Sequence, residues 1–174
     1  AFEPSATFVG EELGGPPPAA GWAVAMDPID GTWGFLNETS TWSCTLAVFR
    51  DGRPFAGFIA NPATGEIAYA VEGGPARFLR ISAFRESDFA MNLGGRPSPA
   101  RRPLVNLHPN RAAAAVNAAL LKAWPRDELT SVRSPGGSPA WSLVEAARGH
   151  FVYVNMWSTR PAQPFDLAAA VLLL

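Results

Sequence analysis

The sequence predicts a layered α/β fold of the α+β kind. In the first half, β-prone runs are separated by two hairpin signals, Asp51-Gly52 and Asn61-Pro62-Ala63-Thr64-Gly65, which indicates an antiparallel meander. In the second half, short apolar strands alternate with helical stretches, which indicates a smaller mixed α/β part. We therefore expect two lobes, residues 1–79 and residues 80–174.

Composition excludes several classes of protein. The 174 residues are 48% hydrophobic and 17% charged, as in an ordinary globular protein, and the formal net charge of −1 argues against a nonspecific nucleic-acid binder. Since no apolar run reaches about 18 residues, we expect a soluble protein without a membrane span. The single cysteine, Cys44, is interpreted as a small buried side chain and fits the reducing cytoplasm.

The elements of the first half follow in order. Residues 7–10 form a short β-prone run, and the stretch Gly14-Gly15-Pro16-Pro17-Pro18 is a loop that returns the chain. Residues 22–26 then form a buried strand that we expect to end at Asp27, beside the end of the first run. The meander strands are expected at residues 43–50, 55–61 and 66–71, and Gly73-Gly74-Pro75 is expected to end the meander.

The second half begins after residues 80–103, which are rich in Arg, Ser, Gly and Pro. The pattern predicts a strand at 104–107, a helix at 109–124, a strand at 130–133 and a buried strand at 151–154. Pro139 fits the first turn of another helix, which Gly149 ends. The chain opens at Ala1 without Met and closes on a helical pattern without an end signal, so we expect missing N-terminal helices and a truncated C-terminal end.

The stretch Asp27-Pro28-Ile29-Asp30-Gly31-Thr32 carries the strongest chemical signal. Two carboxylates three positions apart, with a proline between them and a glycine after them, predict a rigid turn at the C-terminal end of a strand, where open α/β sheets bind ligands. Glu11 and Asp166 also fall at predicted element ends. Clustered carboxylates favour a hard divalent cation such as Mg²⁺ among them. The alternative is that Asp27 and Asp30 are turn residues and that Asp166 caps the last helix.

Three motifs occur together in a recognisable order. They are Gly10-Glu11-Glu12, the Asp27–Thr32 stretch followed by Phe35, and Phe165-Asp166-Leu167-Ala168-Ala169; Gly137-Ser138 entering a helix adds to them. In these motifs the chain resembles the inositol monophosphatase family of Mg²⁺-dependent, lithium-sensitive phosphomonoesterases. The resemblance implies an alternating α/β/α/β/α sugar-phosphatase sandwich, two or three Mg²⁺ ions, a small phosphomonoester substrate and a homodimer.

The resemblance also implies a role for each residue of the site. Thr32, Glu11 and Asp27 would be catalytic, with the Thr32 hydroxyl orienting the attacking water. The implied metal ligands are Glu11, Asp27, the Ile29 carbonyl, Asp30 and Asp166. The implied phosphate ligands are the backbone N–H groups of Gly31 and Thr32. The implied substrate-specificity residues are Gly137, Ser138 and Asn155.

Three functional interpretations stay open. The first is a phosphatase for an inositol, cyclitol or sugar phosphate. The second keeps the chemistry but acts on a nucleotide 3′-phosphate, fructose 1,6-bisphosphate or histidinol phosphate, because Asn155 stands where inositol-specific members carry Glu. The third is a non-catalytic binding protein with the phosphatase fold. Retention of all the implied ligands together argues against it.

Overall fold

The structure is a computed structural model that describes most of the chain. The described residues are 5–10, 14–81, 86–90, 104–106, 114–123, 131–133, 137–149, 153–154 and 163–174. Among these residues, no helix has both the length and the hydrophobicity needed to cross a bilayer.

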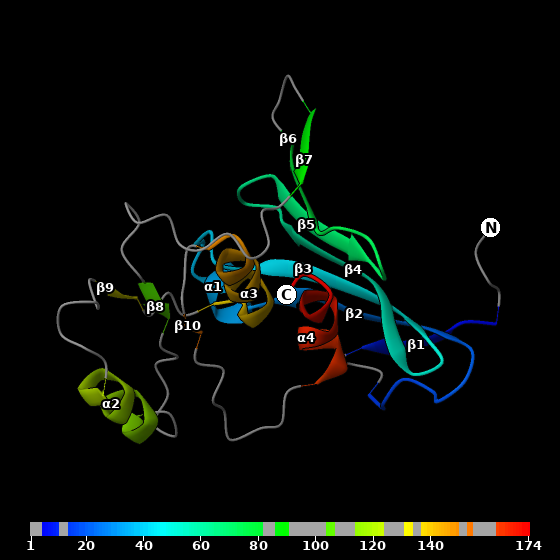
Figure 1. Cartoon of the computed structure of the whole chain (residues 1–174), viewed down its shortest axis with the longest axis horizontal. Helices are drawn as coiled ribbons and strands as arrows, with labels where there is room; N and C mark the ends of the chain where they lie inside the picture. Colours follow the sequence, from blue (N-terminus) through cyan, green and yellow to red (C-terminus); the bar gives the residue numbers. More distant parts are fainter. Residues whose placement is uncertain are drawn as a thin grey trace.

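The larger of two sheets has seven strands, whose spatial order is their order in the sequence (Figure 1). The strands are β1 (Thr7–Gly10), β2 (Trp22–Asp30), β3 (Ser43–Arg50), β4 (Arg53–Asn61), β5 (Glu66–Val71), β6 (Arg77–Ile81) and β7 (Glu86–Ala90). The first two strands pair in parallel, and every later pair is antiparallel. The predicted antiparallel meander is therefore confirmed.

Three predicted boundaries in this sheet are wrong, and the smallest error is the start of β4, which lies at Arg53 and not at Phe55. The meander does not end at Gly73-Gly74-Pro75, because the Gly74 N–H donates to the Val71 carbonyl at 2.8 Å in a turn that reverses the chain into β6. Strand β2 does not end at Asp27 but continues to Asp30 with an interrupted register. The division into lobes at residue 79 stays a prediction, and β6 crosses that position.

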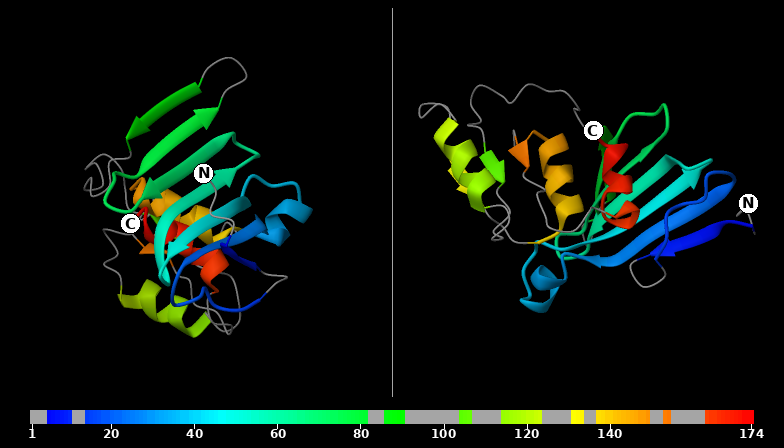
Figure 2. Two further views of the ribbon diagram at one scale, coloured as in Figure 1. Left: turned by 90° about the vertical axis from the view of Figure 1, so that its right-hand side faces the viewer. Right: turned by 90° about the horizontal axis from the view of Figure 1, so that it is seen from below.

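The smaller sheet has three parallel strands in the order β10-β8-β9. Its strands are β8 (Leu104–Asn106), β9 (Ser131–Arg133) and β10 (Tyr153–Val154), and the helices between them are α2 (Ala114–Ala123) and α3 (Pro139–Ala147). The predicted alternation of strands and helices is thus confirmed. Figure 2 shows this sheet and α2 on the far side of α3 from the large sheet.

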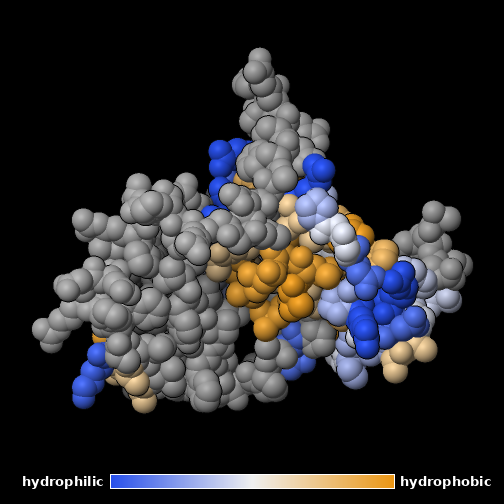
Figure 3. Space-filling view, in the orientation of Figure 1, coloured by the Kyte–Doolittle hydropathy of each residue, from blue (hydrophilic) through white to orange (hydrophobic). Residues whose placement is uncertain are grey.

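Helices α3 and α4 (Pro164–Val171) lie side by side on one face of the large sheet (Figures 1 and 2). The core between them and the sheet includes the fully buried side chains of Ile59, Phe78, Val144 and Leu173. Figure 3 looks onto this face and shows apolar side chains gathered over α4. The hydrophobic contact of these helices with β2, β3 and β4 fixes the helix ends that reach the site.

The opposite face of the sheet is apolar but incompletely covered. Met26, Leu46, Phe58 and Tyr69 follow one another across four paired strands, so their side chains lie in one row. Phe58 stacks on Tyr69 with ring centroids 6.0 Å apart, yet Phe58 is 38% exposed. Its neighbour Ile59 points to the helix-covered face and is 0% exposed. The two faces therefore differ strongly in burial.

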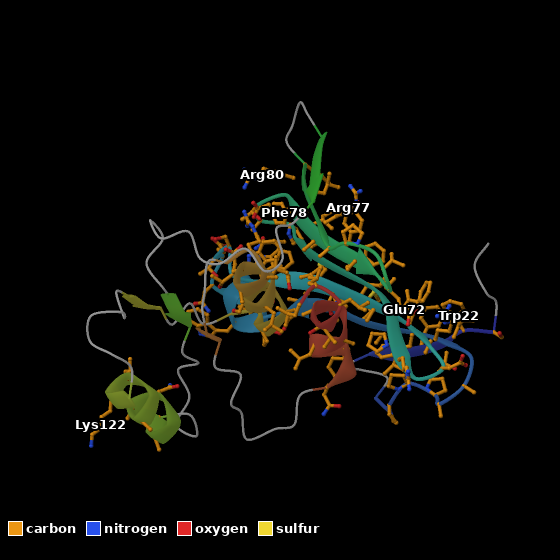
Figure 4. The ribbon with its side chains drawn as sticks, in the orientation of Figure 1. Trp22, Glu72, Arg77, Phe78, Arg80 and Lys122 are labelled. Atoms are coloured by element: carbon orange, nitrogen blue, oxygen red, sulfur yellow. The ribbon has the colours of Figure 1, made fainter. Side chains whose placement is uncertain are left out.

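Charged side chains fasten the C-terminal end of α3 to the sheet. The Arg148 guanidinium lies 4.1 Å from the ring centroid of Phe78 and donates to the Glu145 carboxylate at 2.9 Å. Glu66 on β5 is within 3.9 Å of the same guanidinium and accepts from Arg80 Nε at 3.1 Å. Figure 4 shows Phe78 and Arg80 at the upper part of the sheet, beside α3. This network orients α3, whose other end reaches the candidate site.

Candidate active site

The end of β2 carries both carboxylates of the Asp27–Thr32 stretch. Asp27 pairs with Thr45 and Asp30 with Ser43, and the register breaks between these two pairs. Pro28 lies in the break and has no N–H for the ladder, while the Ile29 N–H donates to Asp27 Oδ1 at 2.9 Å. The predicted turn is therefore an irregularity at the end of a strand. It leaves Asp27 and Asp30 only 5% and 4% exposed.

Gly31 follows Asp30 and begins the short helix α1 (Thr32–Leu36) with a φ of 84°. A side chain at this position would be strained by the left-handed backbone, and its Cβ would lie 2.8 Å from the carbonyl carbon of Gly137. Thr32 is next, and its hydroxyl donates to the Ile29 carbonyl at 3.3 Å. The sequence therefore needs glycine at position 31 for both conformation and space.

The N-terminal end of α3 packs directly against this turn. Ser138 caps the helix by accepting from the Trp141 N–H at 2.8 Å, and its own N–H donates to the Thr41 carbonyl at 2.7 Å. The Ser138 hydroxyl also bonds to Asp30 Oδ2, which accepts from the Ala140 N–H at 3.0 Å. A carboxylate at the start of a helix is stabilised by the helix N–H groups.

The start of α4 is tied to the strand beside Asp27. Thr45, the cross-strand partner of Asp27, donates its hydroxyl to the Phe165 carbonyl at 2.7 Å. Asp166 is the next residue and lies in the first turn of α4, which begins at Pro164. Because the helix starts before Asp166, the alternative that this residue is the N-cap is wrong. The contact brings the Asp166 backbone toward Asp27.

The parallel pair β1–β2 places the end of β1 beside β2, next to the Asp27–Thr32 stretch. Gly10, the last residue of β1, pairs with Met26, which directly precedes Asp27 in β2. Glu11 itself lies outside the described residues, as do Asn155 and the side chain of Asp166. Among the residues that the structure describes, no three His, Cys, Asp or Glu side chains lie together in a group that could hold a metal ion. The metal roles of these residues stay predictions.

The described donors nevertheless fit a hard divalent cation. Asp27, Asp30 and the Ile29 carbonyl offer oxygen atoms within four consecutive residues, and both carboxylates are buried. Burying two carboxylates is unfavourable unless hydrogen bonds or a cation offset the loss of their hydration. The oxygen-only donor set suits Mg²⁺ better than a softer metal.

Sequence inspection did not identify three polar groups that the structure places at the site. They are the Ser43 hydroxyl, the Thr45 hydroxyl and the Ala140 N–H. Ser43 and Thr45 occupy the inward-facing positions of β3, which alternate with half-buried ones. The sequence signal for Ser43 and Thr45 was the presence of polar residues at inward positions of a strand. Buried hydroxyl groups need hydrogen-bond partners, so such residues indicate a polar site.

Cys44 lies between these two inward residues and is half-buried, whereas the sequence analysis predicted a buried side chain. Burial raises the pKa of its thiol, and the negative charge of Asp27 raises that pKa further. A raised pKa disfavours the nucleophilic thiolate. This agrees with the interpretation of Cys44 as an unreactive packing residue.

A comparison with protein families matches the description "Inositol monophosphatase family" over residues 1–174. An inositol-1-monophosphatase of Rhizobium meliloti is 30% identical over 173 residues, which is 95% of this chain and 57% of the relative. A histidinol-phosphatase of Mycobacterium tuberculosis is 34% identical over 70 residues, which is 40% of this chain and 27% of the relative.

The solved structure of inositol monophosphatase II from Staphylococcus aureus has the same fold. It superposes with a TM-score of 0.72 at 23% identity, over 98% of this chain and 60% of that chain. The chain thus spans less than two thirds of the length of the Rhizobium and Staphylococcus proteins. The predicted phosphatase sandwich is confirmed as the fold class.

Proposed function

Because this chain belongs to the inositol monophosphatase family, we propose that the full-length protein is a divalent-metal-dependent phosphomonoester hydrolase. The observation that carries the proposal is the end of β2, where two buried carboxylates and a backbone carbonyl stand beside a glycine turn. The end of β1 pairs with β2 through Gly10, the start of α3 reaches Asp30 through Ala140, and the start of α4 is bonded through Phe165 to Thr45, the cross-strand partner of Asp27.

The proposed metal ligands come from three parts of the chain. Glu11, Asp27 and the Ile29 carbonyl would hold one Mg²⁺ ion, and Asp27, Asp30 and Asp166 would hold another; the family permits two or three. When bound, these cations would activate water, neutralise the phosphate oxygens and stabilise the leaving alkoxide.

The remaining groups of the turn would act on the substrate. The N–H groups of Gly31 and Thr32 would bind the phosphate, since a glycine turn at a helix start directs N–H groups toward an anion. The Thr32 hydroxyl, which donates to the Ile29 carbonyl, would orient the attacking water. Neither His108 nor His150 has a role in this scheme.

The proposed chemistry would act on any phosphomonoester, but we propose a narrower class of substrates. We propose an inositol, cyclitol or sugar phosphate, in line with the named activity of the Rhizobium relative. We propose that Asn155 contacts a substrate hydroxyl. Because Asn155 lacks the charge of the Glu found in inositol-specific members, other substrates are alternatives. The Mycobacterium relative named histidinol-phosphatase makes histidinol phosphate the first alternative, ahead of nucleotide 3′-phosphates and fructose 1,6-bisphosphate.

The test is phosphate release by the full-length protein from these phosphomonoesters, with Mg²⁺ and with EDTA. We expect turnover of at least one substrate, lost with EDTA and restored by Mg²⁺. Asp27→Asn should lower kcat/KM by more than about 100-fold, since even residues behind a metal ligand contribute 10- to 100-fold. Asp51→Asn is the matched control, because Asp51 lies at an exposed hairpin and its Oδ1 accepts from the Gly21 N–H.

Two results would contradict the proposal. No turnover of any substrate by a protein that still binds metal would support the non-catalytic interpretation. Near-normal turnover by Asp27→Asn would mean that the metal cluster is assigned to the wrong residues. Far-ultraviolet circular dichroism of both variants checks that each one is folded.

Assembly and location are also proposals. Members of this family commonly form homodimers, so we propose a homodimer, which light scattering of the full-length protein would check. We also propose a cytoplasmic location, because a single cysteine suits a reducing compartment.

A further inference from the structure

Two buried serines stand behind Asp30 and link it to two different elements. We propose that Ser43 and Ser138 orient the Asp30 carboxylate for binding a divalent cation. We call the hydrogen-bonded series Ser43, Ser138 and Asp30 the hydroxyl relay. Ser43 is then a positioning residue, and Ser138 acts through Asp30 rather than by touching the substrate. This inference rests on the proposed metal-dependent function.

The relay is compact and shielded from water. Ser43 is the cross-strand partner of Asp30, and Ser138 caps the helix that packs on them. The two hydroxyl oxygens are 2.7 Å apart, and Ser43 Oγ is 3.4 Å from Asp30 Oδ2. Ser43, Asp30 and Ser138 are all buried. No bulk water is therefore available to replace a missing hydroxyl partner.

One arrangement of the hydrogens gives a donor to each of the two short oxygen–oxygen contacts in the relay. An ionised carboxylate only accepts, so Ser138 donates its single hydrogen to Asp30. The Trp141 N–H occupies one lone pair of Ser138 Oγ. The other lone pair accepts from Ser43, which therefore donates. The order of donation is Ser43 to Ser138 to Asp30.

The arrangement fixes the orientation of the Asp30 carboxylate. Oδ2 receives the Ser138 hydroxyl and the Ala140 N–H, both from the start of α3, while the Ser43 hydroxyl from β3 holds Ser138 in place. Rotating the carboxylate would break these bonds together. A ligand that is already oriented loses less freedom when a cation binds, which is why residues behind metal ligands affect metal affinity.

The test measures cation binding directly in the full-length protein, by electron paramagnetic resonance of free Mn²⁺ during a titration. Asp30→Asn identifies the Mn²⁺ site to which Asp30 contributes. At that site we expect about 10-fold weaker binding in Ser43→Ala and about 10- to 100-fold weaker binding in Ser138→Ala. Ser138→Thr keeps the hydroxyl and should retain most of the affinity.

Ser142→Ala is the matched control, because Ser142 lies on the same helix and its hydroxyl donates to the Ser138 carbonyl, not to Asp30. Its Mn²⁺ affinity should equal that of the wild type. Because the relay is a chain, the double variant Ser43→Ala/Ser138→Ala should bind no more weakly than Ser138→Ala alone.

The relay is refuted if Ser43→Ala binds Mn²⁺ like the wild type, or if Ser142→Ala loses as much affinity. If Ser43→Ala does not fold, the pair Ser138→Ala and Ser138→Thr decides, and equal affinities in that pair overturn the proposal. A wild-type protein that binds no Mn²⁺ and releases no phosphate refutes the proposed function instead. The two failures are therefore distinguishable.

Discussion

The contact between Gly31 and the start of α3 can be tested by adding one methyl group. Gly31→Ala places a Cβ on a residue with φ of 84°, where that Cβ would lie 2.8 Å from the Gly137 carbonyl carbon and closer still to the Ser138 backbone nitrogen. Backbone atoms cannot rotate away as a flexible side chain would. Either the turn or the N-terminal end of α3 must move.

The size of the effect follows from two separate terms. A non-glycine residue in the left-handed region costs about 1–2 kcal/mol. Overpacking against a buried backbone adds about 1–3 kcal/mol. We therefore expect Gly31→Ala to lower the free energy of unfolding by about 2–5 kcal/mol. A displacement of about 1 Å at a catalytic group costs on the order of 100-fold, so kcat/KM should fall by a similar factor.

A matched variant separates the two terms. Gly21 has a φ of 83°, but a Cβ there would meet nothing within 4 Å. Gly21→Ala should therefore show only the backbone term, about 1–2 kcal/mol, with kcat/KM unchanged. Urea unfolding and phosphate release of the full-length variants measure both quantities. Equal unfolding free energies for Gly31→Ala and Gly21→Ala, with normal turnover in both, would refute the close contact between the turn and α3.

The remaining predictions concern packing, ion pairs and inhibition. Ile59→Ala should lower the unfolding free energy of the 174-residue chain by about 2–5 kcal/mol, whereas Phe58→Ala, on the exposed face, should cost clearly less; equal losses would mean that Phe58 is covered. Arg148 and Arg50 each combine an ion pair with a ring contact, but their side chains are 20% and 47% exposed. Because exposure weakens such contacts, Arg148→Ala should lower the free energy of unfolding by about 1–2 kcal/mol and Arg50→Ala by less than about 1 kcal/mol. The reverse order in urea unfolding would contradict this. Phosphate release should be inhibited by lithium, as the family resemblance implies, and an insensitive enzyme would show that this property does not extend to this protein.

Local sequence signals predicted strands β1 to β5 of the large sheet but neither β6 nor β7. Strands β1, β3 and β5 have the predicted limits, because hairpin residues such as Asp51-Gly52 mark strand ends within a few positions of the chain. The signal failed at Gly73-Gly74-Pro75, because the same residue types end a strand whether the chain leaves the sheet or turns back into it. Only pairing with another strand decides between these outcomes.

The sequence by itself determined which residues we propose to carry the chemistry, because Asp27, Asp30, Gly31 and Thr32 lie within one stretch of six residues and form a recognisable motif. The tertiary structure decided how Asp30 is held. Ser43 and Ser138 are 95 positions apart, and Ser138 and Asp30 are 108 apart, so no local pattern links them. Their bonds exist because hydrophobic packing of α3 on the sheet places the start of this helix on the end of β2, and a buried hydroxyl there must find a partner.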